Sequence, residues 1–445
     1  MPSPVRSSSR VLVVGGGVAG LAVAVRLAQS GRAVTVFERS KLGAGASTRN
    51  QGWLHSGAAF AVDQPGIARL CYDSLRETLR FCPGCVEPGH DGAVFLLSDD
   101  GADPDRWLRA WSELGIPHRP FPPGQLRERV PRLAPSAARH AFLLPDRSVR
   151  VDLLLRHLAA AAEQAGAEVR PATEAVRLLR NRNTVYGVVT GLGEEVTGRL
   201  VVLAVNTRSA TLLPEFVART DGEESTGHSL VALKAHLIAV EPALTAWPIC
   251  LPEADGFNHL PHPPRSVFGT SRWLPAESPA DERPVEEEFE WIRRHVARLF
   301  PASRGETREA AAWAGTTMQA IPPGHELPKA ISWPTVIDHS REPEPVHGVL
   351  SVFPGRATLW ARLAEEALRV VSAKLGGPPP EVAVPPWQAD ATDGPPAPER
   401  SPETVAVYHC QKCGRVQRRA PGLQTPVCCE TAMVRVADAA LARPI

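Results

Sequence analysis

The sequence predicts an α/β protein with a parallel-sheet domain, an antiparallel-sheet domain and a small C-terminal cysteine module. The first domain is predicted from a strand, glycine loop, helix and second strand over residues 10–40. The second is predicted from strand-like runs between about residues 225 and 335, interrupted by one strong helix. Four of the eight cysteines cluster near the end of the 445-residue chain and indicate the third. This length allows two or three domains and a large core.

The N-terminal run is the most informative stretch. Val11–Val14 is a short apolar segment typical of a buried parallel strand. Gly15, Gly17 and Gly20 follow in a G-x-G-x-x-G pattern and lead into a helix rich in Ala, Leu and Val. Gly31 is the predicted C-cap of that helix. The pattern predicts a strand–turn–helix unit with a tight glycine loop.

A second strand at residues 33–37 ends at Glu38, whose carboxylate can accept hydrogen bonds from ribose hydroxyls. Gly15 permits the tight turn, Gly17 lets the backbone approach a pyrophosphate, and Gly20 lets helix and strand pack closely. The helix N-terminus adds free N–H groups and partial positive charge for phosphates. Together these features predict a dinucleotide-binding site.

The rest of the chain alternates further helices and strands. Helices are expected at about residues 67–80, 104–114, 152–165 and 284–300, and again at the end of the segment 347–377. Strands are expected at 93–97, in a hairpin before 200–205, at 230–241, at 266–274 and at the start of 347–377.

The predicted dinucleotide-binding domain is discontinuous, because its elements recur on both sides of the predicted antiparallel sheet. The assigned segments are 1–90, 145–225 and 340–377 for this domain, 91–144 and 226–339 for the substrate domain, 378–404 for a Pro-rich linker and 405–445 for the cysteine module.

Composition excludes several classes of protein. Hydrophobic residues make up 43% and charged residues 22%, which is ordinary for a globular protein. The formal net charge of +1 gives no electrostatic footprint for nucleic acid. The N-terminus lacks the apolar core of a secretory signal, and no apolar run reaches membrane-spanning length. We therefore expect a soluble cytoplasmic protein without a membrane span.

Four segments carry a resemblance to a known family: GGGVAGLAVAVRLAQSGRAVTVFE, STRNQGWLHSGAAF, AAWAGTTMQAIP and GVLSVFPGRATLWARLAEEAL. In this order they resemble FAD-dependent amine and hydroxy-acid oxidoreductases, a group with D-amino-acid oxidase, glycerol-3-phosphate dehydrogenase and L-2-hydroxyglutarate dehydrogenase. The resemblance covers about residues 10–375. It implies FAD as cofactor, an FAD-binding Rossmann-like domain with an antiparallel-sheet substrate domain, and hydride transfer from a CH–OH or CH–NH centre of a small-molecule substrate.

The resemblance also implies which residues contact FAD. The implied contacts are Gly15, Gly17, Gly20 and Glu38 at the ADP half, the Val176 backbone at adenine, Arg49, Asn50, Gln51 and Gly52 beside the isoalloxazine, and Gly355, Arg356, Ala357 and Thr358 at the far end of the flavin. The helix that begins at Thr358 would direct its positive end at the flavin N1/O2 locus and stabilise reduced flavin. Ala204 and Asn206 stand where the family usually has an Ala-Gly pair.

His55 is the candidate catalytic base. Hydride removal from a carbon that bears a hydroxyl requires a base for the O–H proton, and imidazole titrates near neutral pH. The alternative is a histidine that only hydrogen-bonds within a turn. Arg272 is a candidate clamp for a carboxylate or phosphate, with a plain surface arginine as the alternative. Asn50 is a third candidate in the active site, and Arg147 and Arg150 are weaker candidates.

The C-terminal cysteines form a separate motif. Cys410 and Cys413 make a C-x-x-C pair, followed by the vicinal Cys428 and Cys429. This pattern, with Met433 after it, resembles desulforedoxin and the N-terminal domain of desulfoferrodoxin, which implies a small metal-binding β module that tends to form a homodimer. Four thiolates favour tetrahedral iron or zinc, and so short a module has too little core to fold without metal.

Three functional hypotheses follow. The leading one is an FAD-dependent dehydrogenase that passes electrons through a rubredoxin-like iron site to an acceptor protein or quinone. The second is an FAD oxidase with a structural zinc module, and the third is a non-enzymatic flavin or iron sensor. A flavin monooxygenase is disfavoured because no Gly-Asp block precedes the final helix. Among the other cysteines, the Cys82/Cys85 C-x-x-C is interpreted as incidental or structural, and Cys71 and Cys250 as buried apolar residues.

Overall fold

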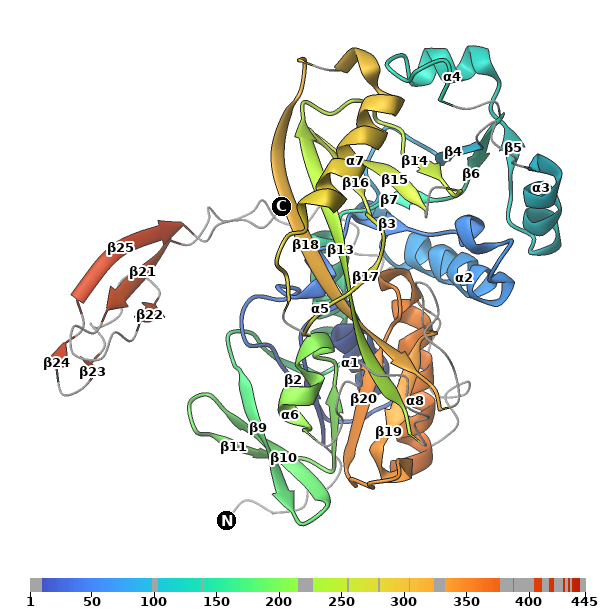
Figure 1. The fold of residues 1–445 in the computed structure, drawn as a ribbon. Helices are drawn as coiled ribbons and strands as arrows, with labels where there is room; N and C mark the ends of the chain where they lie inside the picture. Colours follow the sequence, from blue (N-terminus) through green and yellow to red (C-terminus); the bar gives the residue numbers. More distant parts are fainter. Residues whose placement is uncertain are drawn as a thin grey trace. The chain divides into compact units, whose positions relative to one another are not determined.

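The computed structural model divides into two compact units, Met1–Ala389 and Asp390–Ile445. In the first unit it describes residues 10–97, 103–137, 140–214, 227–253, 256–278, 281–303, 305–323, 333–376 and 387. In the second unit it describes the backbone of residues 404–409, 416–419, 427–428, 431–432 and 434–440. Figure 1 shows the elements of both units, and each unit is described by itself.

The predicted N-terminal unit is confirmed as β1 (Val11–Val14), α1 (Val18–Gln29) and β2 (Val34–Phe37). These strands join β8 (Glu168–Arg170), β12 (Leu200–Leu203), β19 (Thr335–Asp338) and β20 (Val349–Phe353) in a sheet of order β19-β20-β12-β1-β2-β8. All neighbours are parallel except the edge strand β19. Since β19 lies in the segment assigned to the substrate domain, this sheet takes in residues before position 340.

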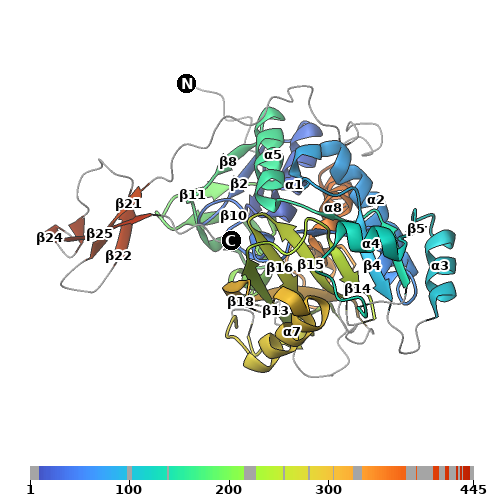
Figure 2. The same cartoon turned by 90° about the horizontal axis from the view of Figure 1, so that it is seen from above.

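The side chains of β1 explain why it is apolar throughout. Val11 and Val13 pack on the helical side, against α1, α5 (Val151–Gln164) and α8 (Trp360–Leu375). These three helices lie together in Figure 2. Leu12 and Val14 pack on the other side. The antiparallel strands β9 (Ala175–Asn181), β10 (Thr184–Thr190) and β11 (Glu195–Thr197) cover that side. A strand covered on both faces has no solvent-facing position, which removes the polar alternation.

The second sheet combines strands from both segments assigned to the substrate domain. Its members are β4 (Ala93–Leu97), β5 (Arg119–Pro120), β6 (His140–Leu144), β13 (Ser229–Glu241), β14 (Ile249–Leu251), β15 (Phe257–His262), β16 (Arg265–Gly269), β17 (Leu274–Pro275) and β18 (Arg308–Ile321). It is antiparallel as predicted except where β4 runs parallel to β14. The long strands β13 and β18 pair along most of their length and cross the middle of Figure 1.

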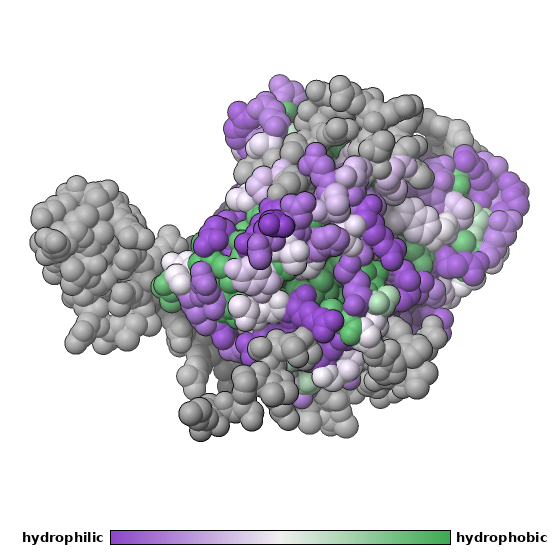
Figure 3. All heavy atoms as spheres, turned by 90° about the horizontal axis from the view of Figure 1, so that it is seen from below, coloured by the Kyte–Doolittle hydropathy of each residue, from purple (hydrophilic) through white to green (hydrophobic). Residues whose placement is uncertain are grey.

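The remaining helices surround the two sheets. They are α2 (Pro65–Phe81), α3 (Pro104–Glu113), α4 (Pro123–Arg129), α6 (Ser209–Leu212) and α7 (Glu286–Leu299), with a 3₁₀ turn, η8 (Ala357–Leu359), before α8. The short strands β3 (Trp53–Leu54) and β7 (Arg147–Ser148) pair with each other. No helix among the described residues is long and apolar enough to cross a membrane. The face in Figure 3 mixes hydrophilic residues with smaller hydrophobic areas.

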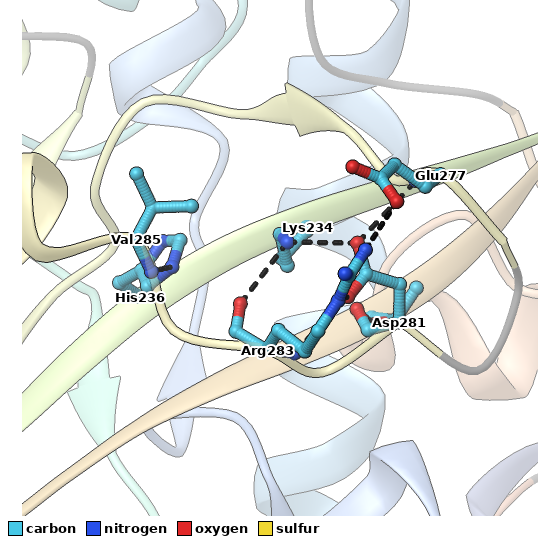
Figure 4. A network of polar contacts seen from close by, with 7 residues as sticks. Lys234, His236, Glu277, Asp281, Arg283 and Val285 are labelled. Carbon is cyan, nitrogen blue, oxygen red and sulfur yellow. Dashed lines mark hydrogen bonds and ion pairs between the residues drawn. The ribbon is translucent and has the colours of Figure 1, made fainter.

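A buried ion pair fixes the segment between β17 and α7 onto β13 (Figure 4). The Lys234 Nζ donates to Asp281 Oδ2 at 2.9 Å and to the carbonyl oxygen of Arg283 at 3.1 Å. The backbone N–H of Val285 donates to Nε2 of the fully buried His236 at 3.0 Å. Hydrogen bonds from Arg283 and Lys234 lower the pKa of Asp281. The segment is therefore bound to β13 at Lys234 and His236, two buried residues on the same face of the strand.

An Asp281→Asn substitution should destabilise the first unit by about 3–5 kcal/mol, because it leaves the buried ammonium of Lys234 without its counter-charge. Urea unfolding followed by circular dichroism measures this loss. The matched control is Glu277→Gln, since Glu277 pairs with Arg283 from an exposed position and such a pair contributes about 1 kcal/mol or less. Equal effects of the two substitutions would contradict the buried-pair account.

Trp387, within the predicted linker, is part of the core of the first unit. It is 4% exposed, and its ring lies 3.8 Å from the guanidinium carbon of Arg26. Its Nε1 donates to Glu365 Oε1 at 3.0 Å, and its ring meets Trp360 edge-on at 4.6 Å. The chain is thus anchored again beyond the end of α8, at a position inside the segment 378–404 that was predicted to be a linker.

The second unit contains β21 (Thr404–His409), β22 (Val416–Arg419), β23 (Val427–Cys428), β24 (Thr431–Ala432) and β25 (Val434–Ala440). β21 lies between β22 and β25, and β23 pairs with β24 in a two-stranded hairpin. Cys428 ends β23, whereas Cys410, Cys413 and Cys429 lie outside the described residues. Over the described part of the chain, no group of three or more His, Cys, Asp or Glu side chains is arranged to hold a metal ion.

Candidate active site

A cavity of about 810 Å³ lies at the carboxyl end of β1, where the glycine loop turns into α1. Its lining includes Gly15, Gly17, Glu38, Ala204 and Asn206. The position is the one at which open parallel sheets bind ligands, because the strand ends and the helix N-terminus meet there. The predicted nucleotide-binding residues are thus brought together around one space.

Contacts around the loop explain why glycine occupies these positions. Gly15 has a φ of +111°, and a Cβ there would lie 2.4 Å from the carbonyl oxygen of Ala204. A Cβ on Gly20 would lie 1.9 Å from the carbonyl oxygen of Gly15. At Gly17 the nearest atom would be Ser47 Oγ at 2.8 Å, a side-chain atom that can move. Gly15 and Gly20 are therefore required by the fold, whereas Gly17 keeps the cavity open.

Two other predicted nucleotide contacts differ from the simplest expectation. The Glu38 carboxylate accepts from the backbone N–H of Gly16 at 2.9 Å and of Ser40 at 3.0 Å, so it holds the glycine loop in shape. Val176 is 45% exposed and does not line the cavity, although its neighbour Ala175 does. Asn206 adopts a φ of +47°, a backbone conformation that glycine and asparagine tolerate best, which agrees with the glycine that the family resemblance implies for this position.

A second cavity of about 1030 Å³ continues from the first, and both are lined by Val18, Ala46, Ser47, Arg49, Asn206 and Thr316. It lies between the segment that contains β3 and the sheet strands β13 and β18. Its other lining residues include Asn50, Gln51, His55, Phe60, Arg106, Arg272, Gln319, Gly355, Arg356 and Ala357. The two cavities form one cleft between the two sheets. Their volumes, about 810 and 1030 Å³, leave space for a dinucleotide and a small substrate.

His55 lies in this cleft with a neutral side chain. It is 7% exposed, and its ring packs against Trp53 at 4.0 Å and Phe60 at 5.3 Å between centroids. Its backbone N–H donates to Thr358 Oγ1 at 3.2 Å. Burial, and then the positive charge of Arg356, hold the pKa of His55 well below its usual value. The ring is therefore unprotonated at neutral pH, and its buried Nδ1 has no hydrogen-bond partner among the described residues.

Arg356 lies next to His55 and packs on the same aromatic ring. Its guanidinium carbon lies 4.0 Å from the ring centroid of Phe60, and its buried Nε has no partner in the described part of the chain. Burial lowers the pKa of Arg356 to about 10, so it remains a cation at neutral pH. None of the described carboxylates forms an ion pair with Arg356. Arg356 is half-buried and lines the larger cavity, so its guanidinium is available to an anion in the cleft.

The other predicted site residues are engaged within the protein. Arg272 lines the cleft, is about half exposed and pairs with the buried Glu288. Arg49 also lines the cleft and pairs with Glu282. The Asn50 side chain holds its own turn, since its Oδ1 accepts from the N–H of Gly52 at 2.8 Å. Their predicted roles toward ligands thus stay predictions.

The structure also places the remaining residues that the sequence singled out. Thr358 is buried and connects His55 to η8, and Gly355 has a φ of +68° that suits a tight turn. Arg147 and Arg150 are absent from the cleft lining. Cys82 and Cys85 are buried and form no disulfide bond with the described residues, in agreement with a structural interpretation.

Asp146 is a buried carboxyl group that sequence reasoning missed. It is fully buried, its Oδ1 accepts from Trp53 Nε1 at 2.9 Å, and its Oδ2 accepts from the Ser56 hydroxyl. It therefore holds residues on both sides of His55 in the chain. Burial raises the pKa of Asp146 to about 6 from an ordinary value of 3.8. No local motif marks it, because its partners lie far away in the sequence.

The stability of an Asp146→Asn variant should increase relative to that of the wild type as the pH rises. Since the folded-state pKa is raised, the carboxyl group stabilises the fold below about pH 4 and loses that contribution as pH rises through about 6. Asparagine can accept from Trp53 and donate to Ser56 without ionising. Between about pH 4 and pH 7.5, the unfolding free energy of the wild type should therefore fall by about 2–3 kcal/mol relative to that of the variant.

Urea unfolding of wild type and Asp146→Asn at both pH values measures this shift. Asp91→Asn serves as the control, because Asp91 is an exposed aspartate on the loop before β4. A pH-independent difference between wild type and Asp146→Asn would contradict the assignment of a buried, titrating carboxyl group.

The residues of the cleft fit FAD. The glycine loop forms a tight cradle, in which a Cβ at Gly15 or Gly20 would collide with backbone oxygens and a side chain at Gly17 would fill the open space. The cleft continues from this cradle to the N-terminal end of η8, where Gly355, Arg356 and Ala357 line the same cavity. FAD bound along this cleft would have its ADP half beside Gly15 and Gly17 and its isoalloxazine in the larger cavity, beside residues 49–51 and 355–357.

Comparisons with known proteins agree with this cleft. A family described as FAD dependent oxidoreductase (DAO) matches residues 10–334. One chain of the anaerobic glycerol-3-phosphate dehydrogenase of Escherichia coli K12 is 28% identical over 382 residues, which cover 84% of this chain and 68% of that protein. The glycine oxidase of Pseudomonas aeruginosa is 28% identical over 317 residues, 69% of this chain and 82% of that protein.

Solved structures show the same fold. Glycine oxidase from Geobacillus kaustophilus aligns with a TM-score of 0.61 at 23% identity, over 87% of this chain and all of that one. L-Proline dehydrogenase from P. horikoshii aligns with a TM-score of 0.63 at 19% identity, over 83% of this chain and 95% of that one. With a family match that spans most of the chain, the protein belongs to the FAD dependent oxidoreductase (DAO) family and is an FAD-dependent oxidoreductase.

Proposed function

We propose that this enzyme oxidises the CH–OH centre of a small anionic substrate, a 2-hydroxy acid or a polyol phosphate. FAD, when bound in the cleft, accepts the hydride. The observation that carries the proposal is the pair formed by His55 and Arg356. Both line the 1030 Å³ cavity, both pack on Phe60, and each has a buried nitrogen without a partner among the described residues.

His55 supplies the base. A CH–OH substrate cannot release hydride efficiently unless its hydroxyl proton is removed, and a buried, unprotonated imidazole can accept that proton. The lowered pKa keeps His55 in this form at neutral pH. An amine substrate can lose its proton to water before it binds, so it needs such a base less. The neutral state of His55 therefore favours CH–OH over CH–NH oxidation.

Arg356 supplies the charge that orients the substrate. Its guanidinium has no carboxylate partner within the described residues, and a carboxylate or phosphate on the substrate would satisfy it with charge-assisted hydrogen bonds. Arg272, by contrast, already pairs with Glu288. We therefore assign the anion-binding role first to Arg356, with Arg272 at the outer part of the cleft.

The test is anaerobic reduction of the FAD-loaded protein by four compounds, followed by loss of oxidised-flavin absorbance. Glycerol 3-phosphate and L-2-hydroxyglutarate represent CH–OH substrates, and glycine and L-proline represent CH–NH substrates. The proposal expects reduction by a CH–OH compound and weaker apparent binding of it in Arg356→Met. Reduction by the amino acids alone would overturn the CH–OH assignment and return the role of His55 to packing.

For the C-terminal unit we propose that Cys410, Cys413, Cys428 and Cys429 hold one iron. Such a site carries single electrons without changing its ligands, which suits transfer to an acceptor protein or quinone. Support comes from the cysteine spacing, and from a β hairpin whose first strand ends at Cys428. A homodimer is part of this proposal, since modules of this pattern tend to pair. The alternative is a structural zinc site.

The electron-relay proposal is tested by ending the chain after Ala389, which retains the Trp387 anchor of the first unit. Dye reduction at the flavin should persist in this variant, whereas reduction of the acceptor present in cell membranes or extracts should be lost. Cys428→Ser with Cys429→Ser should behave in the same way. Stoichiometric zinc in protein from iron-replete cells, with both activities intact after truncation, would overturn the relay.

A further inference from the structure

The C-x-x-C pair Cys82 and Cys85 lies in a tight turn outside the cleft. Cys82 follows the last residue of α2, and the 3₁₀ turn η4 (Pro83–Cys85) comes next. The N–H of Cys85 donates to the carbonyl oxygen of Cys82 at 3.1 Å. A turn of this kind brings its first and fourth Cα atoms within about 7 Å, and a disulfide bond joins Cα atoms that are about 4.4–6.8 Å apart. The backbone therefore holds the two cysteines within reach of a disulfide bond.

The two thiols meet in the interior of the protein. They are hydrogen-bonded to each other. Cys82 is 6% exposed and Cys85 is fully buried, and both belong to the same hydrophobic core cluster. Pro83 and Gly84, at the tip of the turn, are exposed. Closure of a bond between the two sulfur atoms therefore requires rotation of the side chains and no rearrangement of the helices.

Hydrogen bonds fix the backbone on either side of the pair. The N–H of Cys82 donates to the carbonyl oxygen of Thr78 at 2.8 Å, where α2 ends. The carbonyl oxygen of Cys85 accepts from the N–H of Arg150 at 2.7 Å, where α5 begins. Among the described residues, no third His, Cys, Asp or Glu side chain joins the pair as a metal ligand. A disulfide bond is therefore the chemistry that this pair offers, and it would join the end of α2 to the start of α5.

We propose that Cys82 and Cys85 form a reversible dithiol–disulfide site that reacts with small-molecule disulfides such as glutathione disulfide. The thiolate of Cys82, the less buried of the two, attacks one sulfur of the small disulfide, forms a mixed disulfide and releases one small thiolate. The thiolate of Cys85 then attacks Sγ of Cys82, forms the intramolecular bond and releases the second. The two cysteines lose two electrons and two protons, and the small disulfide gains them as two thiols.

The exchange is expected to be slow in the folded protein. The hydrogen bond with Cys82, and then burial, raise the pKa of Cys85 above its usual value. Because the thiolate is the reacting form, a raised pKa slows the step that uses Cys85. The final balance between dithiol and disulfide does not change for this reason, because the Cys85 thiol is protonated at neutral pH with or without the shift. The reaction is therefore followed until it reaches equilibrium.

The test is incubation of the folded full-length protein with mixtures of reduced and oxidised glutathione, followed by acid quenching, alkylation of free thiols, trypsin digestion and mass spectrometry. Both cysteines fall on one tryptic peptide, residues 81–106. As the oxidised fraction of glutathione rises, this peptide should lose two hydrogens and its reaction with the alkylating reagent, and excess dithiothreitol should restore both. A peptide that is still alkylated at both cysteines in oxidised glutathione alone would overturn the proposal, as would glutathione adducts that persist at equilibrium.

Cys71 and Cys250 are the internal controls, because each is buried and each falls on a tryptic peptide of its own. Both should stay free thiols while the pair closes. If the pair closes only when Cys71 and Cys250 also gain glutathione, the reaction requires unfolding, and the proposal fails. Neither Cys82 nor Cys85 lines the cleft, so the same result is expected with and without FAD, and the outcome does not depend on the proposed function.

Two variants test the order of the steps. In Cys85→Ala, Cys82 should keep a glutathione adduct, because no second thiol displaces it. In Cys82→Ala, the fully buried Cys85 should stay a free thiol. An adduct on Cys85, or no adduct in either variant, would overturn the assignment of Cys82 as the first nucleophile. The wild-type measurement decides the existence of the site even if a variant does not fold.

Discussion

A His55→Asn variant is expected to bind FAD normally and to be reduced by its substrate about 10²–10⁴-fold more slowly than wild type. The loss follows from removing the imidazole of the cleft, which is neutral at neutral pH and whose Nδ1 has no hydrogen-bond partner among the described residues. Asparagine cannot take a proton from a hydroxyl at neutral pH. Anaerobic stopped-flow absorbance of the flavin measures the rate, and unchanged reduction kinetics would move the base to another residue.

Two further variants separate chemistry from packing. His55→Phe keeps an aromatic ring between Trp53 and Phe60, so it should lose as much rate as asparagine if the proton matters. His157→Asn changes a histidine that packs on Phe81, away from the cleft, and should leave the rate unchanged. A slow asparagine variant with a fast phenylalanine variant would indicate that ring packing, and not proton transfer, explains the effect.

A Gly17→Val variant is expected to fold and to purify without FAD. The added Cβ would meet the movable Ser47 hydroxyl, which accepts from the Val18 N–H at 3.0 Å, while the two methyl groups occupy the space for the phosphates. The flavin content of purified protein measures the outcome. Gly124→Val is the control, because none of the described atoms would lie within 4 Å of a Cβ at Gly124, which is outside the cleft lining. A Gly17→Val protein with full flavin content would contradict the assignment of the cradle.

The local parts of the fold could be predicted from the sequence. The unit from β1 to β2 follows from an apolar run, three spaced glycines and a helix of small apolar residues, all within one stretch of chain. The Gly15 and Gly20 contacts explain why this pattern is so specific, since each glycine meets backbone atoms that leave no space for a side chain. The strand predicted to reach residue 205 ends instead at Leu203, where the chain turns toward Asn206 at positive φ.

The long-range contacts of the site could not be predicted in this way. Asp146 meets Trp53 and Ser56 across about ninety positions of sequence, and no motif connects them. The contact between His262 and Gln51 likewise depends on two segments that only the folded sheet brings together. Arg356 was identified by resemblance, but the absence of a carboxylate beside it among the described residues is a property of the packing. Trp387 falls in a Pro-rich stretch whose composition predicts a linker.

The most direct test of the central claim is the absorbance spectrum of the purified full-length protein with FAD, recorded anaerobically before and after glycerol 3-phosphate or L-2-hydroxyglutarate is added. The account predicts a bound oxidised flavin whose visible absorbance is lost with one of these compounds, and retained when His55 is changed to asparagine. A protein that neither contains flavin nor binds added FAD would contradict it.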